Sequence, residues 1–198
     1  MKVLLINGSP HEKGCTYTAL SLIAGELKAQ GIETEILHVG GQPVGGCIGC
    51  GGCRSGNGCV FGGVVNEAIE KAKTADGFVF GSPVHYASAT GNMTSFMDRL
   101  AYAGGKYLAY KPAAICCSAR RAGTTSTLDQ LVKYPQFFHM PLVNGSYWAM
   151  VHGSNPEQVL QDAEGCAVMQ ELGRNMAWLL HCLSLIHISE PTRPLYIS

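Results

Sequence analysis

The sequence predicts one α/β domain in which helices cover both faces of a five-stranded parallel sheet. Its 198 residues suffice for a single domain with a sizeable core, but not for two ordinary domains. Short apolar runs alternate along the chain with segments of helical periodicity, which predicts βαβ units. Turns rich in glycine, of which the chain has 25, follow several of the apolar runs. We therefore expect a three-layer sandwich with the doubly wound strand order 2-1-3-4-5.

The amino-terminal elements follow from simple patterns. Residues 2–6 form a short apolar run, which predicts a buried strand. Residues 16–30 have apolar side chains at helical spacing, and Gly31 ends this helix. Residues 33–39 alternate in polarity and predict the second strand. Residues 40–63 are dense in Gly and Cys, which predicts a loop of the length that usually serves a function or is disordered.

The remaining elements continue the alternation of helix and strand. Helices are expected over residues 64–75, 91–103, 125–138 and 156–181. Strands are expected over residues 77–80, 113–117 and 142–150. The turn Gly81–Pro83 is expected to end the third strand. No linker or internal repeat divides the domain.

Composition excludes several classes of protein. The formal net charge is zero, so the chain offers no broad electrostatic footprint for nucleic acid or for an anionic membrane. The opening apolar run is too short for a signal peptide, and no stretch has the length of a transmembrane helix. We expect a cytoplasmic protein that binds neither nucleic acid nor membrane. In that reducing compartment, clustered cysteines indicate metal or redox chemistry rather than a disulfide framework.

The last residues do not fit the pattern of the domain. Residues 183–198, LSLIHISEPTRPLYIS, resemble the translation of an adapter used in preparing sequencing libraries. We therefore expect the domain to comprise residues 1–182 and residues 183–198 to be a non-native tail. A natural disordered terminus is the alternative.

A candidate phosphate site follows the first strand. The segment Gly8–Thr16 has small residues that let the backbone approach an anion, and Ser9 and Thr16 supply hydroxyl groups. The amino terminus of the next helix adds free N–H groups and a favourable dipole. An ordinary turn is the alternative. Because this segment follows the first strand of a predicted doubly wound sheet, we expect it to bind phosphate.

Two further loops follow the third and fourth strands. Gly81–Met93 combines backbone amides with Tyr86, which together can border a flat ring system. Its alternative is a plain turn in which Tyr86 covers the core. Ser118–Thr125 includes two arginines, and a solvated basic loop is its alternative.

Together the three loops resemble the NADPH-dependent FMN reductase family. The motifs are GSPxxxGxT, GSPVxYxxxxGxMxxFxDR and SARRxGTT, and the resemblance extends from Met1 to about Cys182. It implies a flavodoxin-like fold in which the first loop holds the FMN phosphate, the second lies along the isoalloxazine ring and the third closes the site. The implied FMN-binding residues are Ser9, His11, Gly14, Cys15, Thr16, Pro83, Val84, His85, Tyr86, Ser118, Ala119, Arg120 and Gly123.

This chain departs from the family pattern at two positions. His11 stands where arginine is common and Cys15 where asparagine is common, so both weaken the polar grip on the phosphate. His85 could donate a hydrogen bond to the flavin, although such a histidine is more often simply half exposed. The fingerprint GxGxxG with an acidic residue about twenty positions on is absent, which favours FMN over FAD.

The cysteine loop is a second strong motif. Cys47, Cys50, Cys53 and Cys59 follow the pattern CxxCxxCx5C among glycines. Four cysteines are the usual ligands of a [4Fe–4S] cluster, and a zinc site or free thiols are the alternatives. Zinc ribbons usually place two CxxC pairs on separate knuckles, which this spacing does not. The compact run resembles the iron–sulfur flavoproteins, a branch of the same family in which the cluster passes electrons to FMN.

The resemblance implies an NAD(P)H-dependent FMN oxidoreductase. Hydride from NAD(P)H would reach the flavin, and electrons would leave to an unknown acceptor directly or through the cluster. No protein side chain need act as a catalytic acid, base or nucleophile. One alternative is an electron-transfer module reduced by ferredoxin, and another is a zinc-stapled interaction protein. The cysteine loop and the apolar face of residues 91–103, whose Met and Phe exceed what one flavin pocket needs, lead us to expect a homo-oligomer.

Overall fold

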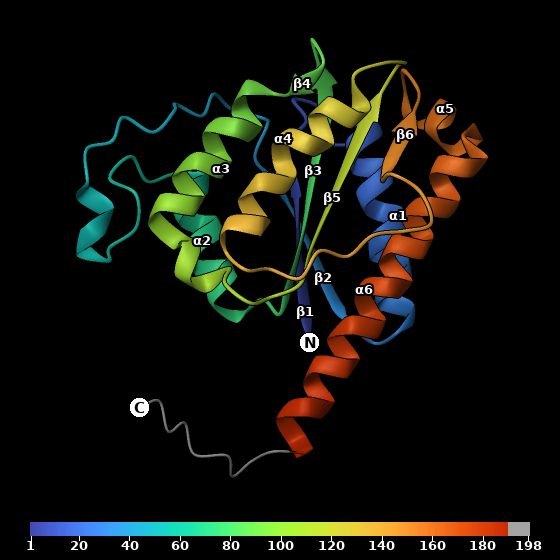
Figure 1. Cartoon of the computed structure of the whole chain (residues 1–198). Helices are drawn as coiled ribbons and strands as arrows, with labels where there is room; N and C mark the ends of the chain where they lie inside the picture. The colour runs from blue at the N-terminus through green and yellow to red at the C-terminus, as the bar shows by residue number, and fades with distance from the viewer. Residues whose placement is uncertain (190–198) are drawn as a thin grey trace.

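The computed structural model describes residues 1–189, and it places a mainly parallel sheet between two layers of helices (Figure 1). The strands are β1 (Lys2–Asn7), β2 (Glu33–His38), β3 (Gly77–His85), β4 (Ser88–Ala89), β5 (Ala113–Ala119) and β6 (Met150–His152). The α-helices are α1 (Cys15–Ala29), α2 (Val64–Thr74), α3 (Gly91–Gly104), α4 (Thr124–Phe137), α5 (Pro156–Gln161) and α6 (Ala163–Ser189). Two short 3-10 helices are η1 (Gly52–Ser55) and η2 (Gly105–Tyr107).

The strand order confirms the doubly wound α/β fold. The order is β2-β1-β3-β5-β6, with every neighbouring pair parallel, and β4 pairs antiparallel with β3. The five predicted strands therefore appear in the predicted order. The two-residue β4 raises the number of strands to six in the described part of the chain, so the prediction of five was one too few.

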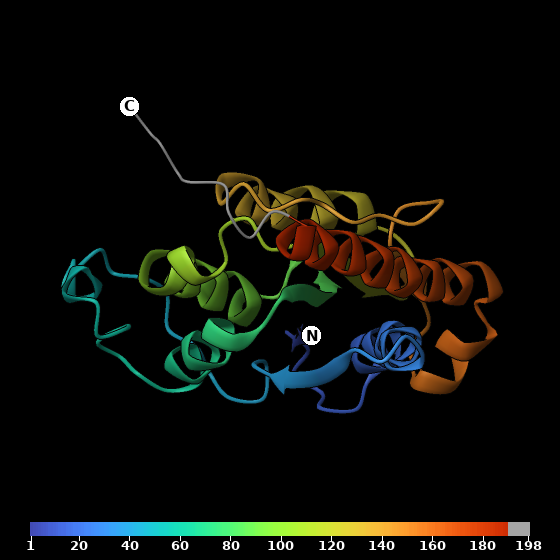
Figure 2. The same ribbon diagram turned by 90° about the horizontal axis from the view of Figure 1, so that it is seen from below.

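Alternation along the central strands builds two hydrophobic cores. Val3 and Leu5 of β1 pack in the core beneath α1 and α6, whereas Leu4 and Ile6 pack in the core beneath α2, α3 and α4. Successive side chains of a strand point to opposite faces, so a strand covered on both sides is apolar throughout. Figure 2 shows the resulting layers, with the sheet between the two groups of helices.

The apolar face of α3 is used within this fold. Met93, Phe96, Met97 and Leu100 are all buried in the core beneath α2, α3 and α4. These side chains are therefore not available to a second subunit. This helix face was wrongly expected to contact another subunit, because α3 packs on the sheet with that face.

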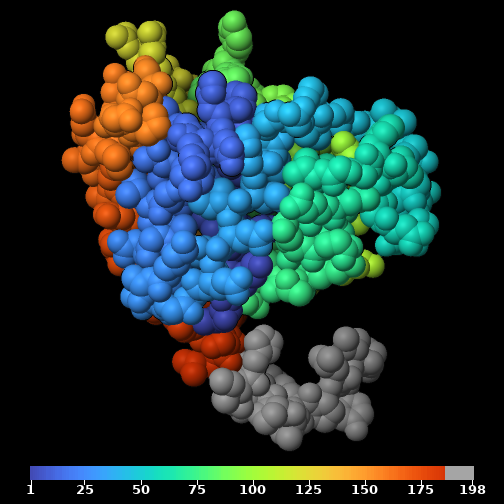
Figure 3. All heavy atoms as spheres, turned by 180° about the vertical axis from the view of Figure 1, so that it is seen from behind, coloured from blue at the N-terminus to red at the C-terminus, as the bar shows by residue number. Residues whose placement is uncertain are grey.

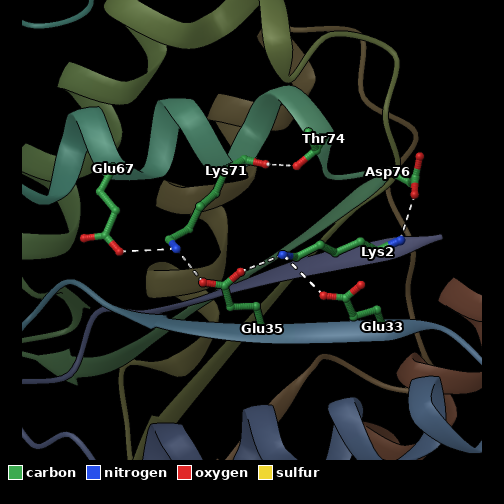
Figure 4. Close-up of polar contacts among 7 residues, drawn as sticks. All are labelled: Lys2, Glu33, Glu35, Glu67, Lys71, Thr74 and Asp76. Atoms are coloured by element: carbon green, nitrogen blue, oxygen red, sulfur yellow. Dashed lines mark hydrogen bonds and ion pairs between the residues drawn. The ribbon is translucent and has the colours of Figure 1, made fainter.

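An ion-pair network joins the edge of the sheet to α2 (Figure 4). The Glu35 carboxylate lies 2.8 Å from Lys2 Nζ and 2.6 Å from Lys71 Nζ. Hydrogen bonds from Lys2 and then Lys71 hold the pKa of Glu35 below its ordinary value. Lys2 and Lys71 also approach Glu33 and Glu67, each at 3.4 Å. The network joins β2, an edge strand, to β1 and α2.

The fifth strand differs from its prediction. Residues 142–150 were expected to be a strand, but β6 begins only at Met150. Leu142 forms an isolated bridge with Ala113, and the chain then leaves the sheet. Side chains of α6 bind this segment instead: Asn175 Nδ2 donates to the Asn144 carbonyl at 2.8 Å, and a Glu171 carboxylate oxygen accepts from the Ser146 N–H at 2.7 Å. Backbone groups need partners, but sheet neighbours are not required to supply them.

Two other boundaries also differ. The third strand does not end at Gly81–Pro83, because Ser82 and Pro83 continue the parallel register with Cys117 and Ser118 of β5. The last predicted helix is two helices separated at Asp162, whose carboxylate accepts from the His152 and Gly165 N–H groups.

The carboxyl-terminal helix passes the expected domain boundary. Helix α6 continues to Ser189 rather than ending at residue 181. Residues 190–198 of the expected non-native tail lie outside the described residues, and the boundary at residue 182 stays a prediction.

Candidate functional site

The three predicted flavin loops meet at the carboxyl ends of β1, β3 and β5. The Gly8 N–H donates to the Gly81 carbonyl at 2.8 Å, and the Thr90 hydroxyl donates to the Gly8 carbonyl at 2.9 Å. The buried hydroxyl groups of Thr16 and Ser118 are hydrogen-bonded at 2.8 Å. Figure 3 shows the loops together at one end of the molecule, in blue, green and yellow. They form one connected edge, as expected where parallel strands end.

The first loop is organised by Asn7, which is fully buried. Its side-chain oxygen accepts from the Ser9 N–H at 3.1 Å, and its amide donates to the Glu12 carbonyl at 2.9 Å. The Ser9 hydroxyl accepts from the His11 N–H at 3.1 Å. Gly14 precedes α1 and no side chain caps the helix, so the first N–H groups of the helix remain available as hydrogen-bond donors to a ligand. The arrangement suits an anion.

The end of β2 supports this loop from beside β1. The His38 Nε2–H donates to the Ser9 carbonyl at 2.7 Å. A β-carbon at Gly40 would overlap the same carbonyl, so only glycine lets the chain pass here. Sequence reasoning missed Asn7, His38 and Gly40. The only feature of the sequence that marks these residues is their position at the end of β1 or β2 or shortly after it.

The second loop is a strained hairpin that presents Tyr86. Tyr86 and Ala87 have φ angles of 51° and 59°, in the left-handed region that residues with side chains seldom adopt. Helix α4 holds the turn, because Gln130 accepts from the Ala89 N–H at 2.9 Å and Ser126 donates to the Ala87 carbonyl at 2.8 Å. Tyr86 is fully exposed and does not cover the core. Strain kept in place by neighbours is common at ligand sites.

The third loop closes against the second. Gly123 has a φ of 89°, and a β-carbon there would lie 2.7 Å from Ala87 Cα and 2.9 Å from Val84 Cγ1. The His152 Nε2–H, at the end of β6, donates to the Arg121 carbonyl at 3.1 Å. Arg120 is exposed at this edge. The loop therefore lies where a cation could face a bound anion.

The predicted flavin-binding residues differ in exposure. Ser9, Thr16, Ser118 and Ala119 are buried, whereas His11, His85, Tyr86 and Arg120 are exposed. The half-buried members are Gly14, Cys15, Pro83, Val84 and Gly123. The Cys15 thiol donates to the Gly153 carbonyl at 3.5 Å, and burial raises its pKa. Cys15 is thus a neutral thiol engaged with the loop before α5, and only its N–H group is left for an anion.

The cysteine loop stands out beside α3, with η1 at its far end (Figure 1). Cys47, Cys50, Cys53 and Cys59 all line one cavity of about 330 Å³. All nine cysteines are free, and residues 1–189 contain no group of three or more His, Cys, Asp or Glu placed to hold a metal ion. A tetrahedral zinc needs four thiolates at about 2.3 Å from one point, so the loop would have to close further around a single ion.

Two asparagines attach the cysteine loop to the domain. Asn92, in the first turn of α3, donates to the carbonyls of Gly40 at 3.1 Å and Gln42 at 2.9 Å. Asn66 of α2 accepts from the Cys59 N–H at 2.8 Å and donates to the Cys59 carbonyl at 3.0 Å. Because Gly40 also touches the first flavin loop, the cysteine loop starts directly beside the candidate phosphate site.

Comparisons with known proteins found a matching family model, relatives in sequence and solved structures of similar fold. The family model for NADPH-dependent FMN reductase matches residues 1–155. An iron-sulfur flavoprotein of Methanocaldococcus jannaschii is 28% identical over 185 residues, covering 89% of this chain and 96% of the relative.

Solved structures show the same fold. RosB with a bound 8-demethyl-8-formylriboflavin-5'-phosphate intermediate aligns with a TM-score of 0.75 at 14% identity, over 100% of this chain and 90% of RosB. A flavodoxin from the domain Archaea aligns with a TM-score of 0.62 at 13% identity, over 91% of this chain and 99% of the flavodoxin. The fold is flavodoxin-like. Among the described helices, none is both long and apolar enough to cross a bilayer.

Proposed function

The chain belongs to the NADPH-dependent FMN reductase family, and on that premise we propose that it is an FMN-containing oxidoreductase that takes electrons from NAD(P)H. One observation carries the proposal: three loops from separate strands are hydrogen-bonded into a single edge around an uncapped helix terminus. That edge offers donors for one phosphate and a border for a flat ring.

The residues of the edge have separate tasks in this proposal. The N–H groups of Cys15 and Thr16 at the uncapped start of α1, together with the Ser9 hydroxyl, hold the FMN phosphate. Pro83, Val84, His85 and Tyr86 border the ring, and Ser118, Ala119, Arg120 and Gly123 close the site. When bound, FMN accepts hydride and can release electrons singly. The protein binds and orients the cofactor and supplies no nucleophile or base.

We further propose that Cys47, Cys50, Cys53 and Cys59 ligate a [4Fe–4S] cluster that exchanges electrons with FMN. The four thiols line one cavity, and thiolates are the usual ligands of such clusters. The loop begins at Gly40, which touches Ser9. The chain therefore runs from this contact to the cavity, which lies farther along beside Arg99, Tyr102 and Ala103 in the second half of α3. The relative from Methanocaldococcus jannaschii is named an iron-sulfur flavoprotein, which supports the assignment.

We also propose where in the cell the protein lies. We place it in the cytoplasm, where nine free thiols persist.

We also propose a homo-oligomer. The exposed aromatic side chains of Tyr102 and Phe137 flank a groove between α3 and α4, and exposed apolar surface of this kind marks protein contacts.

Anaerobic purification tests the cofactors directly. The expected protein shows flavin bands above a broad iron–sulfur absorption, releases FMN on extraction, and contains iron and sulfide. FAD in the extract would contradict the phosphate assignment. Stoichiometric zinc without sulfide would show that the four cysteines hold a structural zinc ion instead of a cluster. A fully active protein that contains neither zinc nor iron would show that they are free thiols.

Stopped-flow reduction tests the electron donor. We expect NADPH or NADH to bleach the flavin band faster than reduced ferredoxin does. Reduction by ferredoxin alone would make the protein an electron-transfer module instead.

A further inference from the structure

The cysteine cavity contains a buried arginine. Arg99 of α3 is 6% exposed, and it is the one charged side chain classed as buried among residues 1–185. It lines the cavity together with the four cysteines. No ion pair found within the described residues includes Arg99. A buried charge normally requires a partner of opposite charge, because removal from water is costly.

The guanidinium joins three points of the cysteine loop. Its Nε donates to Cys59 Sγ at 3.2 Å, its Nη1 to the Gly45 carbonyl at 3.4 Å, and its Nη2 to the Gly62 carbonyl at 3.0 Å. Gly45 lies before the first cysteine of the motif and Gly62 after the last. The Phe61 ring covers the guanidinium, with its centroid 5.4 Å from Cζ. The planar guanidinium therefore joins both ends of the loop and also donates a hydrogen bond to a sulfur.

We propose that Arg99 is a positioning residue for the cluster: it clamps the two ends of the cysteine loop, and its N–H···S bond and charge raise the reduction potential of the bound cluster. The potential half of this inference rests on the proposed function, whereas the clamp does not. A cluster held by four thiolates is the anionic partner that the buried guanidinium otherwise lacks. Hydrogen bonds to the sulfurs and local charge both set cluster potentials. Reduction by one electron adds a negative charge, which a fixed cation stabilises.

The experiment compares three variants with wild type. Arg99→Gln removes the charge and the N–H fork, and Arg99→Lys keeps the charge but cannot make all three contacts. Arg54→Gln is the matched control, because Arg54 is an exposed arginine that lines the same cavity without a hydrogen bond to a cysteine sulfur. Redox titration of the anaerobically purified proteins, followed by electron paramagnetic resonance, reports the cluster potential.

We expect the potential to become more negative in Arg99→Gln, to shift less in Arg99→Lys, and to stay near the wild-type value in Arg54→Gln. Loss of a group that is hydrogen-bonded to a ligand typically weakens metal binding about 10- to 100-fold, so the iron content of Arg99→Gln should also fall. If Arg99→Gln retains no cluster, the reduction potential measured in Arg99→Lys tests this half of the proposal. An Arg99→Gln protein that holds a full cluster at the wild-type potential overturns this half of the proposal, as does such an Arg99→Lys protein where Arg99→Gln holds no cluster.

Hydrogen exchange tests the clamp without any cluster. In metal-free protein, amides of residues 45–62 should exchange several-fold faster in both Arg99 variants than in wild type or Arg54→Gln. Unchanged exchange overturns the clamp. A wild-type protein that never contains iron and sulfide ends the cluster assignment and the potential half together, while the exchange result still decides the clamp.

Discussion

At the scale of the residue, single atoms decide whether the candidate phosphate site can form. Asn7, His38 and Gly40 each act on Ser9 or on its loop, although none was predicted from the sequence. Asn7 and His38 act through hydrogen bonds of their side chains, whereas Gly40 acts through the absence of a side chain. The clearest case is Gly40, where one added methyl group would collide with a backbone carbonyl.

Gly40→Ala should weaken FMN binding and lower stability. The overlap with the Ser9 carbonyl forces the loop to move, and overpacking of this kind costs roughly 1–3 kcal/mol. A loss of about 1.4 kcal/mol in binding corresponds to tenfold weaker affinity. Fluorescence titration of the apoprotein with FMN and urea unfolding measure the two effects.

Gly25→Ala is the matched control for that substitution. Gly25 lies inside α1, and an added β-carbon there meets open space. Alanine is a better helix former than glycine by about 0.5–1 kcal/mol, so this variant should be more stable with unchanged FMN binding. Equal FMN affinities in the two variants would contradict the role of Gly40.

Glu35 should make stability depend on pH. Its carboxylate is stabilised by Lys2 and Lys71, so its folded pKa is below the unfolded value of about 4.3. The contribution is present above the unfolded pKa and is lost as the pH falls through the folded pKa. Glu35→Gln should therefore cost about 0.5–1 kcal/mol near neutral pH and little in strong acid.

Urea unfolding across the acid range tests this dependence. The control is Glu70→Gln, which removes an exposed carboxylate paired with Lys73. A wild-type protein and a Glu35→Gln variant whose stabilities differ equally at all pH values would rule out the linkage.

At the scale of the element, the cysteine loop and the flavin loops are separate stretches attached to one another by side chains. The flavin loops follow β1, β3 and β5, whereas the cysteine loop joins β2 to α2. Asn92 and Asn66 hold its two ends. Damage to one site should therefore leave the other largely intact.

Cys50→Ser should remove most of the broad iron–sulfur absorption and leave FMN bound. Thiolates suit soft iron–sulfur units, while a serine oxygen is harder and less available at neutral pH. Reduction of the flavin by NAD(P)H should survive, and transfer to one-electron acceptors should fall. Cys182→Ser, outside the loop, is the control and should retain iron, sulfide and FMN. Full iron and sulfide in Cys50→Ser would remove Cys50 from the ligand set.

At the scale of the whole molecule, the proposed homo-oligomer requires a surface to which a second copy would bind. The apolar face of α3 is consumed by the core, so an interface must use other side chains. Tyr102 and Phe137 are 75% and 76% exposed beside one groove. They are the aromatic surface that we expect an oligomer to bury.

Light scattering at micromolar concentration should give the mass of a closed oligomer. Phe137→Lys should shift it toward the mass of one chain, because a charge in an apolar contact is costly. Trp178→Lys, on exposed surface of α6, is the matched control and should not change the mass. A wild-type protein at the mass of a single chain would end the oligomer proposal.

The sequence by itself determined the layered fold, and it predicted the chemical class of the candidate site. The alternation of apolar runs and helical segments is local, so it predicted the strand order and most elements. The motif loops follow those strands, and parallel strands end at one edge, so their meeting was predictable before any contact was known. The cysteine spacing indicated a metal or redox site by the same local logic.

Only the tertiary structure decided which groups contact one another. Residues 142–150 were expected to form one strand, yet Asn175 and Glu171 of α6 bind the backbone of Asn144 and Ser146, which lie outside the sheet. Met93 and Phe96 suggested a subunit contact but fill the core. Arg99 is the last residue of the motif GSPVxYxxxxGxMxxFxDR, but only folding sets its guanidinium against Cys59, Gly45 and Gly62. Such contacts join residues far apart in the chain, and no local pattern records them, because burial and hydrogen-bond partners are properties of the packed molecule.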